Sequence, residues 1–312
     1  MLAPRTSRDE TTDPLMIELD RTRARTSAER GSREPQFSSL PPSLFRAFRD
    51  LAAARSGIQI RDGKETLVAT RIAGRMGELG LDEPAAYLAR LREDPSGVEM
   101  IRFLDALCTT FTGFYRDAEH FTLLASEAAR RLSRGQQRMR VWCAATASGE
   151  EAYSTAMVLS EAVANTEVDY RVLATDLSTS ALRTAIQGRY SQQQLTPVSE
   201  RLRAKYFIPV PTDDGTSSTR FEVSQRLRER VSFARLNLAA PPFPIMAPFD
   251  VILCRNVMIY FDPQVRQRLL DELTRLLRPG GLLLVGHAET LSGLQHQLTP
   301  VQPSALRKPR VA

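Results

Sequence analysis

The fold is decided by one stretch of the chain, RVWCAATASGEE at positions 140–151. Its first half is apolar, as in a buried strand, and its second half is a turn of small residues that leads into a predicted helix. Small residues in the first strand-to-helix turn let a ligand approach the backbone at the carboxyl end of the strand. The stretch therefore predicts an α/β domain with a ligand site at this turn.

Strand and helix patterns alternate from this stretch to the end of the chain. We predict strands at 140–145, 170–175, 231–235, 249–254 and 281–286, and helices at 150–164, 179–187 and 263–277. Such alternation is typical of parallel βαβ units in a doubly wound sheet. The alternation breaks at 191–230, where prolines and an Asp-Asp-Gly turn indicate a small β insertion.

The part of the chain before this domain is different. Residues 38–135 carry helical periodicity without strand alternation, and we predict helices that begin near Pro42 and Pro84 and others at 63–79 and 98–107. Residues 1–37 hold too little apolar surface to offset the entropy of ordering, which predicts a disordered tail. The predicted domains are thus a tail at 1–37, an all-α domain at 38–135 and an α/β domain at 136–312.

Composition narrows the class of protein. The chain is 42% hydrophobic and 25% charged, with a net charge of +6, and no apolar run approaches the roughly 20 residues of a membrane span. We expect a soluble cytoplasmic monomer without membrane insertion. Three cysteines far apart and three histidines without a nearby cysteine predict neither a disulfide framework nor a metal site. The positive charge fits nucleic acid, a membrane surface or an acidic protein alike.

Acidic residues mark the predicted ligand site. Glu150 and Glu151 begin the helix after the small-residue turn, where negative charge repels a phosphate but suits a ligand ammonium group. They equally complement the helix dipole. Asp176 directly follows the second strand, where an acidic residue takes a ribose diol or caps the next helix. Without a G-x-G-x-x-G motif, this combination favours S-adenosylmethionine over a dinucleotide.

At this point the chain resembles a known family, the chemotaxis receptor methyltransferases (CheR), over about residues 45–308. The resemblance is carried by WCAATASGEEAYS at 142–154, CRNVMIYFD at 254–262, RPGG at 278–281 with GHAE at 286–289, and LCTTFTGFYRD at 107–117. It implies a class I S-adenosylmethionine-dependent methyltransferase fold, with an amino-terminal all-α domain and a small β insertion.

The resemblance also implies roles for residues of the cofactor site. Glu150 would take the methionine end and Asp176 the ribose. The remaining cofactor-binding residues implied are Thr110, Thr112, Arg116, Asn237, Leu238, Arg255 and Asn256. Three positions depart from the family pattern: Thr110 stands for an asparagine, Ala145 for a glycine and Ala152 for a proline. A lost hydrogen bond at Thr110 would cost about 0.5–1.5 kcal/mol of cofactor affinity.

The implied reaction is methylation of glutamate side chains on bacterial chemoreceptors, giving γ-glutamyl methyl esters and S-adenosylhomocysteine. A glutamate is already a carboxylate at neutral pH, so the enzyme needs alignment and desolvation rather than a strong base. Tyr260 would lie near the transferring methyl group and orient the reactants; core packing with a satisfied hydroxyl is the other interpretation.

A basic stripe on the all-α domain fits this substrate. Lys64, Arg71 and Arg75 are spaced to share one helix face. Alone, such a stripe is typical of a solvated surface. With the resemblance, it fits docking of the Glu-rich helical segment of a receptor, an encounter that salt would weaken.

Two other functions compete with this interpretation. A nucleic-acid methyltransferase would share the fold, but Arg255-Asn256-Val257 occupies the turn where adenine-N6 enzymes carry a D/N-P-P-Y-like motif, and Cys254 ends an apolar strand. A cofactor-binding sensor without turnover is motivated by the departures at Thr110, Ala145 and Ala152. Turnover of the cofactor separates the sensor from the enzymes.

Overall fold

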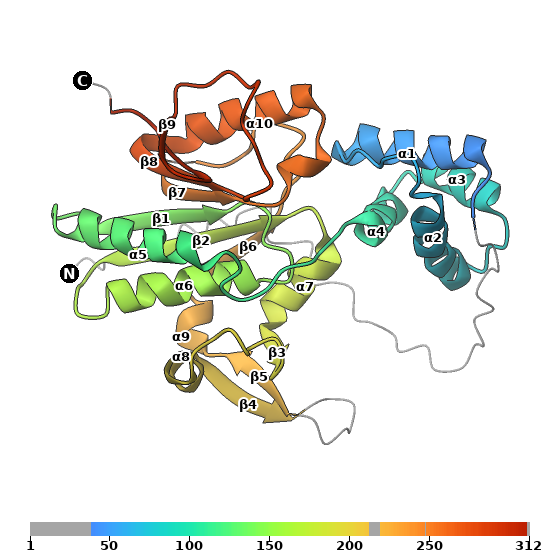
Figure 1. The fold of residues 1–312 in the computed structure, drawn as a ribbon. Helices are drawn as coiled ribbons and strands as arrows, with labels where there is room; N and C mark the ends of the chain where they lie inside the picture. The colour runs from blue at the N-terminus through green and yellow to red at the C-terminus, as the bar shows by residue number, and fades with distance from the viewer. Residues whose placement is uncertain (1–38, 212–218, 247, 311–312) are drawn as a thin grey trace, which may run out of the picture. The chain divides into compact units, whose positions relative to one another are not determined.

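A computed structural model describes residues 39–211, 219–246 and 248–310, all within one compact unit that spans Arg33–Ala312 (Figure 1). The tail predicted at 1–37 and the Asp-Asp-Gly turn at 213–215 lie outside the described residues. No helix in the described ranges is long and apolar enough to cross a bilayer.

The first part of the unit is helical, as expected. It consists of α1 (Pro42–Ser56), α2 (Glu65–Leu79), α3 (Pro84–Glu93) and α4 (Val98–Leu107). Three buried rings hold the core together: Phe48 lies 5.9 Å from Phe103 and 6.1 Å from Tyr87, measured between ring centroids. The apolar positions spaced three and four apart in the sequence thus meet in one small core.

The second part is built on a mostly parallel sheet. Among the described residues, seven strands pair in the order β6–β2–β1–β7–β8–β10–β9. They are β1 (Arg138–Cys143), β2 (Asp169–Asp176), β6 (Val231–Arg235), β7 (Phe249–Cys254), β8 (Leu277–Val285), β9 (Thr299–Gln302) and β10 (Ala305–Arg307). Neighbours from β6 to β8 are parallel, whereas β10 is antiparallel to both β8 and β9. The strand order reverses between β1 and β7, and ligands of doubly wound sheets bind beyond the carboxyl ends at such a reversal.

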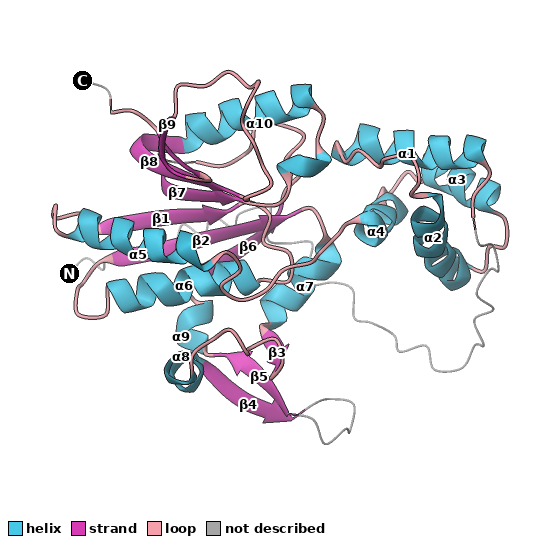
Figure 2. Cartoon of the chain, viewed as in Figure 1, coloured by secondary structure: helices cyan, strands magenta, loops and turns pink. Residues whose placement is uncertain are grey.

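Helices cover both faces of this sheet (Figure 2). One apolar layer joins Val141 and Cys143 of β1 to α5 (Ala118–Leu132) and α6 (Glu150–Ala162). The other joins Trp142 and Ala144 to α10 (Pro263–Leu276). Successive side chains of a strand point to opposite faces, so a strand buried on both faces must be apolar throughout.

A second, antiparallel sheet lies between β2 and β6 in the sequence. It has the order β3–β5–β4 in the described residues, with β3 (Arg189–Ser191), β4 (Phe207–Pro211) and β5 (Thr219–Val223). The neighbouring helices are α7 (Thr179–Gln187), α8 (Glu200–Tyr206) and α9 (Gln225–Arg228). Strands do occur where the alternation of the sequence breaks.

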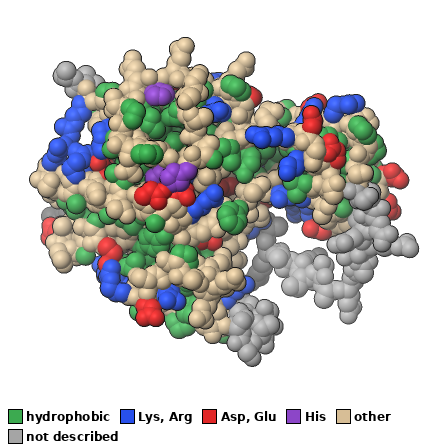
Figure 3. All heavy atoms as spheres, in the orientation of Figure 1, with side chains coloured by type: hydrophobic (Ala, Val, Ile, Leu, Met, Phe, Trp, Pro, Cys, Tyr) green, Lys and Arg blue, Asp and Glu red, His purple; other side chains and the backbone are tan. Residues whose placement is uncertain are grey.

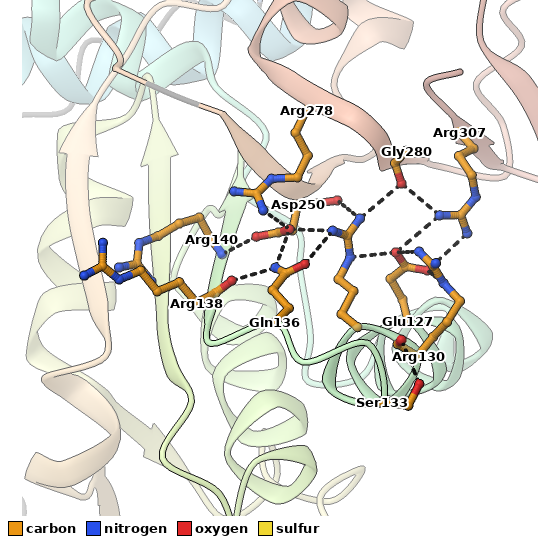
Figure 4. A network of polar contacts seen from close by, with 11 residues as sticks. Glu127, Arg130, Ser133, Gln136, Arg138, Arg140, Asp250, Arg278, Gly280 and Arg307 are labelled. Carbon is orange, nitrogen blue, oxygen red and sulfur yellow. Dashed lines mark hydrogen bonds and ion pairs between the residues drawn. The ribbon is translucent and has the colours of Figure 1, made fainter. Parts of the chain in front are cut away.

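An arginine-rich network joins the amino-terminal end of β7 to the surrounding elements (Figure 4). Asp250 is completely buried, and its Oδ1 accepts hydrogen bonds from Arg131 Nη1 at 2.6 Å and Gln136 Nε2 at 2.8 Å. Arg278 Nη1 lies 3.0 Å from the same oxygen, and the amide of Arg140 donates to Oδ2 at 2.8 Å. Both oxygens of this buried carboxylate therefore have partners, as a buried charge requires.

Candidate functional site

A cavity of about 950 Å³, counting the space that opens to solvent, lies at the carboxyl ends of β1, β2 and β7. Eight of the predicted site residues line it: Thr112, Arg116, Asp176, Asn237, Leu238, Arg255, Asn256 and Tyr260. Two do not: Glu150 and the exposed Thr110. Cys108, Thr109 and Glu151 also line it, although the sequence did not mark the first two as site residues.

The small residues after β1 form one wall of this cavity, as the opening stretch of sequence predicts. Ala144, Ala145 and Ala147 line it. Gly149 ends the turn at φ +98°, and a Cβ there would lie 2.8 Å from both Ala185 Cβ and the Tyr190 hydroxyl. Only glycine fits this close approach of turn, helix and ring. The turn thus sets which way the first residues of α6 point.

Glu150 and Glu151 are neighbours in the chain but face different surroundings. Glu150 accepts hydrogen bonds from Ser148 Oγ at 2.7 Å and Gln194 Nε2 at 3.1 Å, away from the cavity. Glu151 lines the cavity, and its Oε2 accepts from Arg255 Nη1 at 2.9 Å. The structure therefore differs from the expectation for Glu150: the carboxylate that reaches the cavity belongs to the next residue.

The Glu151 carboxylate is only half satisfied. Within the described residues, its Oε1 is buried without a hydrogen-bond partner. Burial raises the pKa of Glu151 to about 7, although Arg255 acts in the opposite direction. A buried carboxylate oxygen that lacks a donor is costly unless a ligand supplies one. This oxygen is suited to a ligand ammonium group.

Asp176 presents a second carboxylate to the cavity. Its Oδ2 accepts from the amide of Ala147 at 2.8 Å and its Oδ1 from the amide of Ser178 at 2.9 Å. Burial raises the pKa of Asp176, while these backbone hydrogen bonds oppose the shift. Each oxygen keeps a lone pair for a further donor, the arrangement that a ribose diol needs.

Arg255 connects the cavity to the segment between the domains. Its Nη2 donates to the carbonyl oxygen of Arg116 at 2.5 Å and to Asp117 Oδ2 at 2.6 Å. Burial lowers the pKa of Arg255, but Glu151 and Asp117 outweigh that effect and the net shift is upward. The guanidinium group thus stays charged and fixes the carboxylate beside it.

The loop that follows β7 is held by the carboxylate of Glu289. This buried group accepts hydrogen bonds from the backbone amides of Asn256, Val257, Met258 and Gly286, at 2.5–2.8 Å. Asn256 has a φ of +58°, and a Cβ on Gly286 would lie 2.7 Å from its Nδ2. The motifs at 254–262 and 286–289 therefore form one unit that shapes the cavity wall.

The helical part contacts the α/β part at three points, each of which involves a backbone group. Tyr260, the last residue of a short 3-10 helix at Met258–Tyr260, accepts a hydrogen bond at its carbonyl oxygen from the amide of Gln59 at 2.7 Å. Asn237 Nδ2 donates to the carbonyl oxygen of Arg55 at 3.0 Å. Asp105 accepts from the amides of Thr179 and Ser180, the first two residues of α7. The all-α part is thus fastened to the α/β part at three points, two of which involve the cavity residues Tyr260 and Asn237.

The predicted basic stripe on α2 is largely engaged within the protein. Arg71 Nη1 donates to the carbonyl oxygens of Ala106 and Cys108 at 2.8 and 2.7 Å. Arg75 forms an ion pair with the buried Glu99 at 2.7 Å, and its side chain is only 11% exposed. Lys64 is exposed just before α2. Two of the three cations therefore hold α2 against α4 rather than project freely.

These features define a class of protein. The protein is a class I S-adenosylmethionine-dependent methyltransferase. Its doubly wound sheet ends in an antiparallel pair, and its cavity has a small-residue turn and two carboxylates where a dinucleotide site would have a phosphate-binding loop. The donor set fits that cofactor, because Glu151 lines the cavity with an Oε1 that has no partner among the described residues, and Asp176 lines it with lone pairs to spare.

The comparisons with known proteins give the family. Residues 110–306 match "CheR methyltransferase, SAM binding domain", and residues 43–108 match "CheR methyltransferase, all-alpha domain". The chain belongs to the CheR methyltransferase family. The family, fold class, enzyme class and cofactor that the sequence predicts are thereby confirmed.

Curated relatives match over most of their length. The "Chemotaxis protein methyltransferase" of Escherichia coli is 37% identical over 261 residues, which cover 84% of this chain and 89% of the relative. The protein of the same name from Salmonella typhimurium is 36% identical, covering 85% and 89%. That of Klebsiella aerogenes is 36% identical, covering 89% and 93%.

Proposed function

We propose that this chain methylates glutamate side chains of chemotaxis receptors in the cytoplasm, acting as a monomer in chemotaxis signal transduction. The observation that carries this is the cavity of a CheR-family fold that Glu151 lines, with one carboxylate oxygen that no described residue hydrogen-bonds. S-adenosylmethionine supplies an electrophilic methyl group on its sulfonium sulfur and leaves as S-adenosylhomocysteine.

Different cavity residues bind different parts of this cofactor. Glu151 Oε1 takes the ammonium group, in place of the Glu150 expected from the sequence, and Asp176 takes the ribose hydroxyls. Arg255 keeps the Glu151 carboxylate in place. The segment between the domains closes the site with Thr112 and Arg116.

The remaining lining residues complete the site. Asn237 and Leu238 bound the adenosine end, and Asn256 lies along the wall that the Glu289 carboxylate fixes. Thr110 does not line the cavity, so its difference from the family's asparagine costs little cofactor affinity in this arrangement.

The acceptor carboxylate needs no base from the protein. A glutamate side chain with an ordinary pKa of about 4.3 is ionised at neutral pH, so alignment and exclusion of water are what remain to be provided. Tyr260 borders the cavity on a helical turn tied to Gln59 through its carbonyl oxygen. We assign its side chain the orientation of the reacting groups, since an acceptor that is already a carboxylate has no proton for the tyrosine to remove.

The all-α domain binds the receptor helix. Lys64 is the exposed cation of the α2 stripe, and we assign it a direct role in attracting an acidic helix. Arg71 and Arg75 serve docking indirectly, because their hydrogen bonds to the α4 region and to Glu99 set the position of α2.

The test uses the purified chain, methyl-labelled S-adenosylmethionine and receptor-bearing membranes of the same organism. We expect label on receptor protein that mild base releases as methanol, the signature of a carboxyl methyl ester. Label that resists base would indicate methylation of nitrogen and overturn the proposal. Cofactor binding without any transfer would favour the sensor interpretation.

A further inference from the structure

Two segments far apart in the sequence bring a carboxylate and two imidazoles together outside the cofactor cavity. Glu119 and His120 belong to the first turn of α5, and His287 follows β8 in the loop that carries Glu289. One ligand atom from each of the three side chains lies within 4.8 Å of the other two. Figure 3 shows histidine side chains against acidic ones on this face of the molecule.

The ring of His120 has no hydrogen-bond partner in the part of the chain that the structure describes. Its side chain is completely buried, and within the described residues neither ring nitrogen has a hydrogen-bond partner. Its ring stacks on that of His287 at 5.3 Å between centroids, with planes 18° apart. A ring nitrogen without a partner among the described residues keeps a lone pair free for a ligand. A buried nitrogen left without a partner is unfavourable unless something binds it.

His287 is already oriented as a ligand would be. Its Nδ1 lies 3.2 Å from Ser304 Oγ, while its Nε2 contacts a carboxylate oxygen of Glu119. In metal sites, the ring nitrogen that does not bind the metal is commonly held by such an outer polar group, which fixes the tautomer. Ser304 can supply this contact without competing for the metal.

We propose that Glu119, His120 and His287 bind a divalent transition metal ion of the zinc class. Two imidazoles and one carboxylate form a typical nitrogen–oxygen set for zinc, whereas magnesium and calcium prefer oxygen ligands throughout. The set leaves a fourth position for water, as in catalytic zinc sites. The sequence predicts no metal site, because its cysteines and histidines are far apart along the chain. Residues 119–120 and His287 come together only in the folded structure.

The spacing of the three groups permits closure on an ion. Ligand atoms around a tetrahedral zinc lie about 3.3 Å apart, so the widest separation must shrink by up to about 1.5 Å, while the contact between Glu119 and His287 must open to admit the ion. The side chains of Glu119 and His287 are 50% and 49% exposed and free to make this movement, and their exposure gives the ion a path from solvent. The buried His120 provides the fixed point.

The experiment is calorimetric titration of the chelator-stripped full chain with Zn²⁺ alone. We expect one ion per chain with a Kd of about 1 µM or tighter. Glu119→Gln and His287→Ala change exposed side chains, so both variants keep the fold, and each should bind Zn²⁺ about tenfold or more weakly. His296→Ala, the exposed third histidine of the chain, is the matched control and should bind like the parent.

Two results would overturn the proposal: no binding by the parent chain at concentrations well above micromolar, or equal affinity in the His287→Ala and His296→Ala variants. Imidazole NMR tests the buried ligand without a His120 variant that could fail to fold. The chain has three histidines, and Zn²⁺ should shift the nitrogen resonances of two of them and leave that of His296 unchanged. The site is separate from the proposed methyl transfer, so binding can be present whether or not the receptor is methylated.

Discussion

A buried carboxylate lies beside an arginine at each end of β7, but only one of the two has all its hydrogen-bond partners. At its amino-terminal end, Asp250 is buried and both carboxylate oxygens accept hydrogen bonds from arginine, glutamine and backbone donors (Figure 4). At its carboxyl end, Arg255 faces the equally buried Glu151, whose Oε1 has no partner among the described residues. A satisfied buried carboxylate indicates stability, whereas a half-satisfied one beside a cavity indicates a ligand.

The largest effect is expected at the satisfied end. Asp250→Ala removes one of the two buried carboxylates, Asp250 and Glu127, that pair with the Arg131 guanidinium group, whose side chain is 8% exposed. Removing one partner of a buried ion pair costs about 3–5 kcal/mol of unfolding free energy. Urea denaturation measures it, with Asp169→Ala as control: that carboxylate is 38% exposed and its loss should cost about 0–1 kcal/mol. Equal losses of unfolding free energy in Asp250→Ala and Asp169→Ala would show that burial of the Asp250 carboxylate adds no stability.

The next effect is expected at the carboxyl end of β7, on cofactor binding. Glu151→Gln removes a charge-assisted hydrogen bond worth about 1.5–3 kcal/mol, so S-adenosylmethionine should bind roughly 10–100-fold more weakly. Glu150→Gln is the matched control and should change the Kd little, since Glu150 does not line the cavity. Calorimetry measures both. If Glu150→Gln proved the more damaging variant, our assignment of the ammonium group to Glu151 would be wrong.

The raised pKa of Glu151 predicts that cofactor affinity and stability depend on pH in opposite directions. Burial raises it from 4.5 to about 7. Protonation removes the charge that binds the ammonium, so cofactor affinity should fall by up to about tenfold per pH unit below 7. The stability contribution runs the other way: it is fully present below about pH 4.5 and is lost as the pH rises through about 7. Titrations between about pH 7.5 and 5.5, where the ligand ammonium stays protonated, measure the affinity. An unchanged slope in Glu151→Gln would assign the titration to another group.

The smallest effect tests the outer part of the Asp250 network. Arg278→Ala removes one of several donors to Asp250, and the Arg278 side chain is 29% exposed. Because the other donors remain, the expected loss of unfolding free energy is about 0.5–1.5 kcal/mol, without a change in cofactor affinity. Urea denaturation and calorimetry measure the two quantities. A weaker cofactor Kd in this variant would mean that the two ends of β7 are coupled.

Much of the fold could be predicted because its elements carry strong periodicity. The helix at 179–187 and the strands at 231–235 and 249–254 agree with α7, β6 and β7 as observed. The antiparallel pair β9–β10 was not predicted. The two strands have four and three residues and β9 is mostly exposed, so neither carries a clear alternation, and β10 is held by its pairing with β8.

The sequence predicts where the site lies in the fold, but not which side chains point into the cavity. The small-residue turn and Asp176 lie where the sequence places them, at the ends of β1 and β2. Which of two adjacent glutamates enters the cavity depends on the turn at Gly149, whose φ of +98° no residue pattern reports. Likewise, the spacing of Arg71 and Arg75 is helical, but their partners on and after α4 lie 24–37 positions away.

The contact of Asp105 with α7 bears on how such proteins can be recombined. The first amides of a helix have no partner within it, and in α7 two of them are satisfied by a carboxylate from the end of α4. The α/β domain therefore does not carry all the residues that complete its own helices. An all-α domain from another protein would leave these two amides to water unless it brought an acceptor to the same place. Exchange of domains by evolution or by design therefore has to preserve this contact or accept its loss.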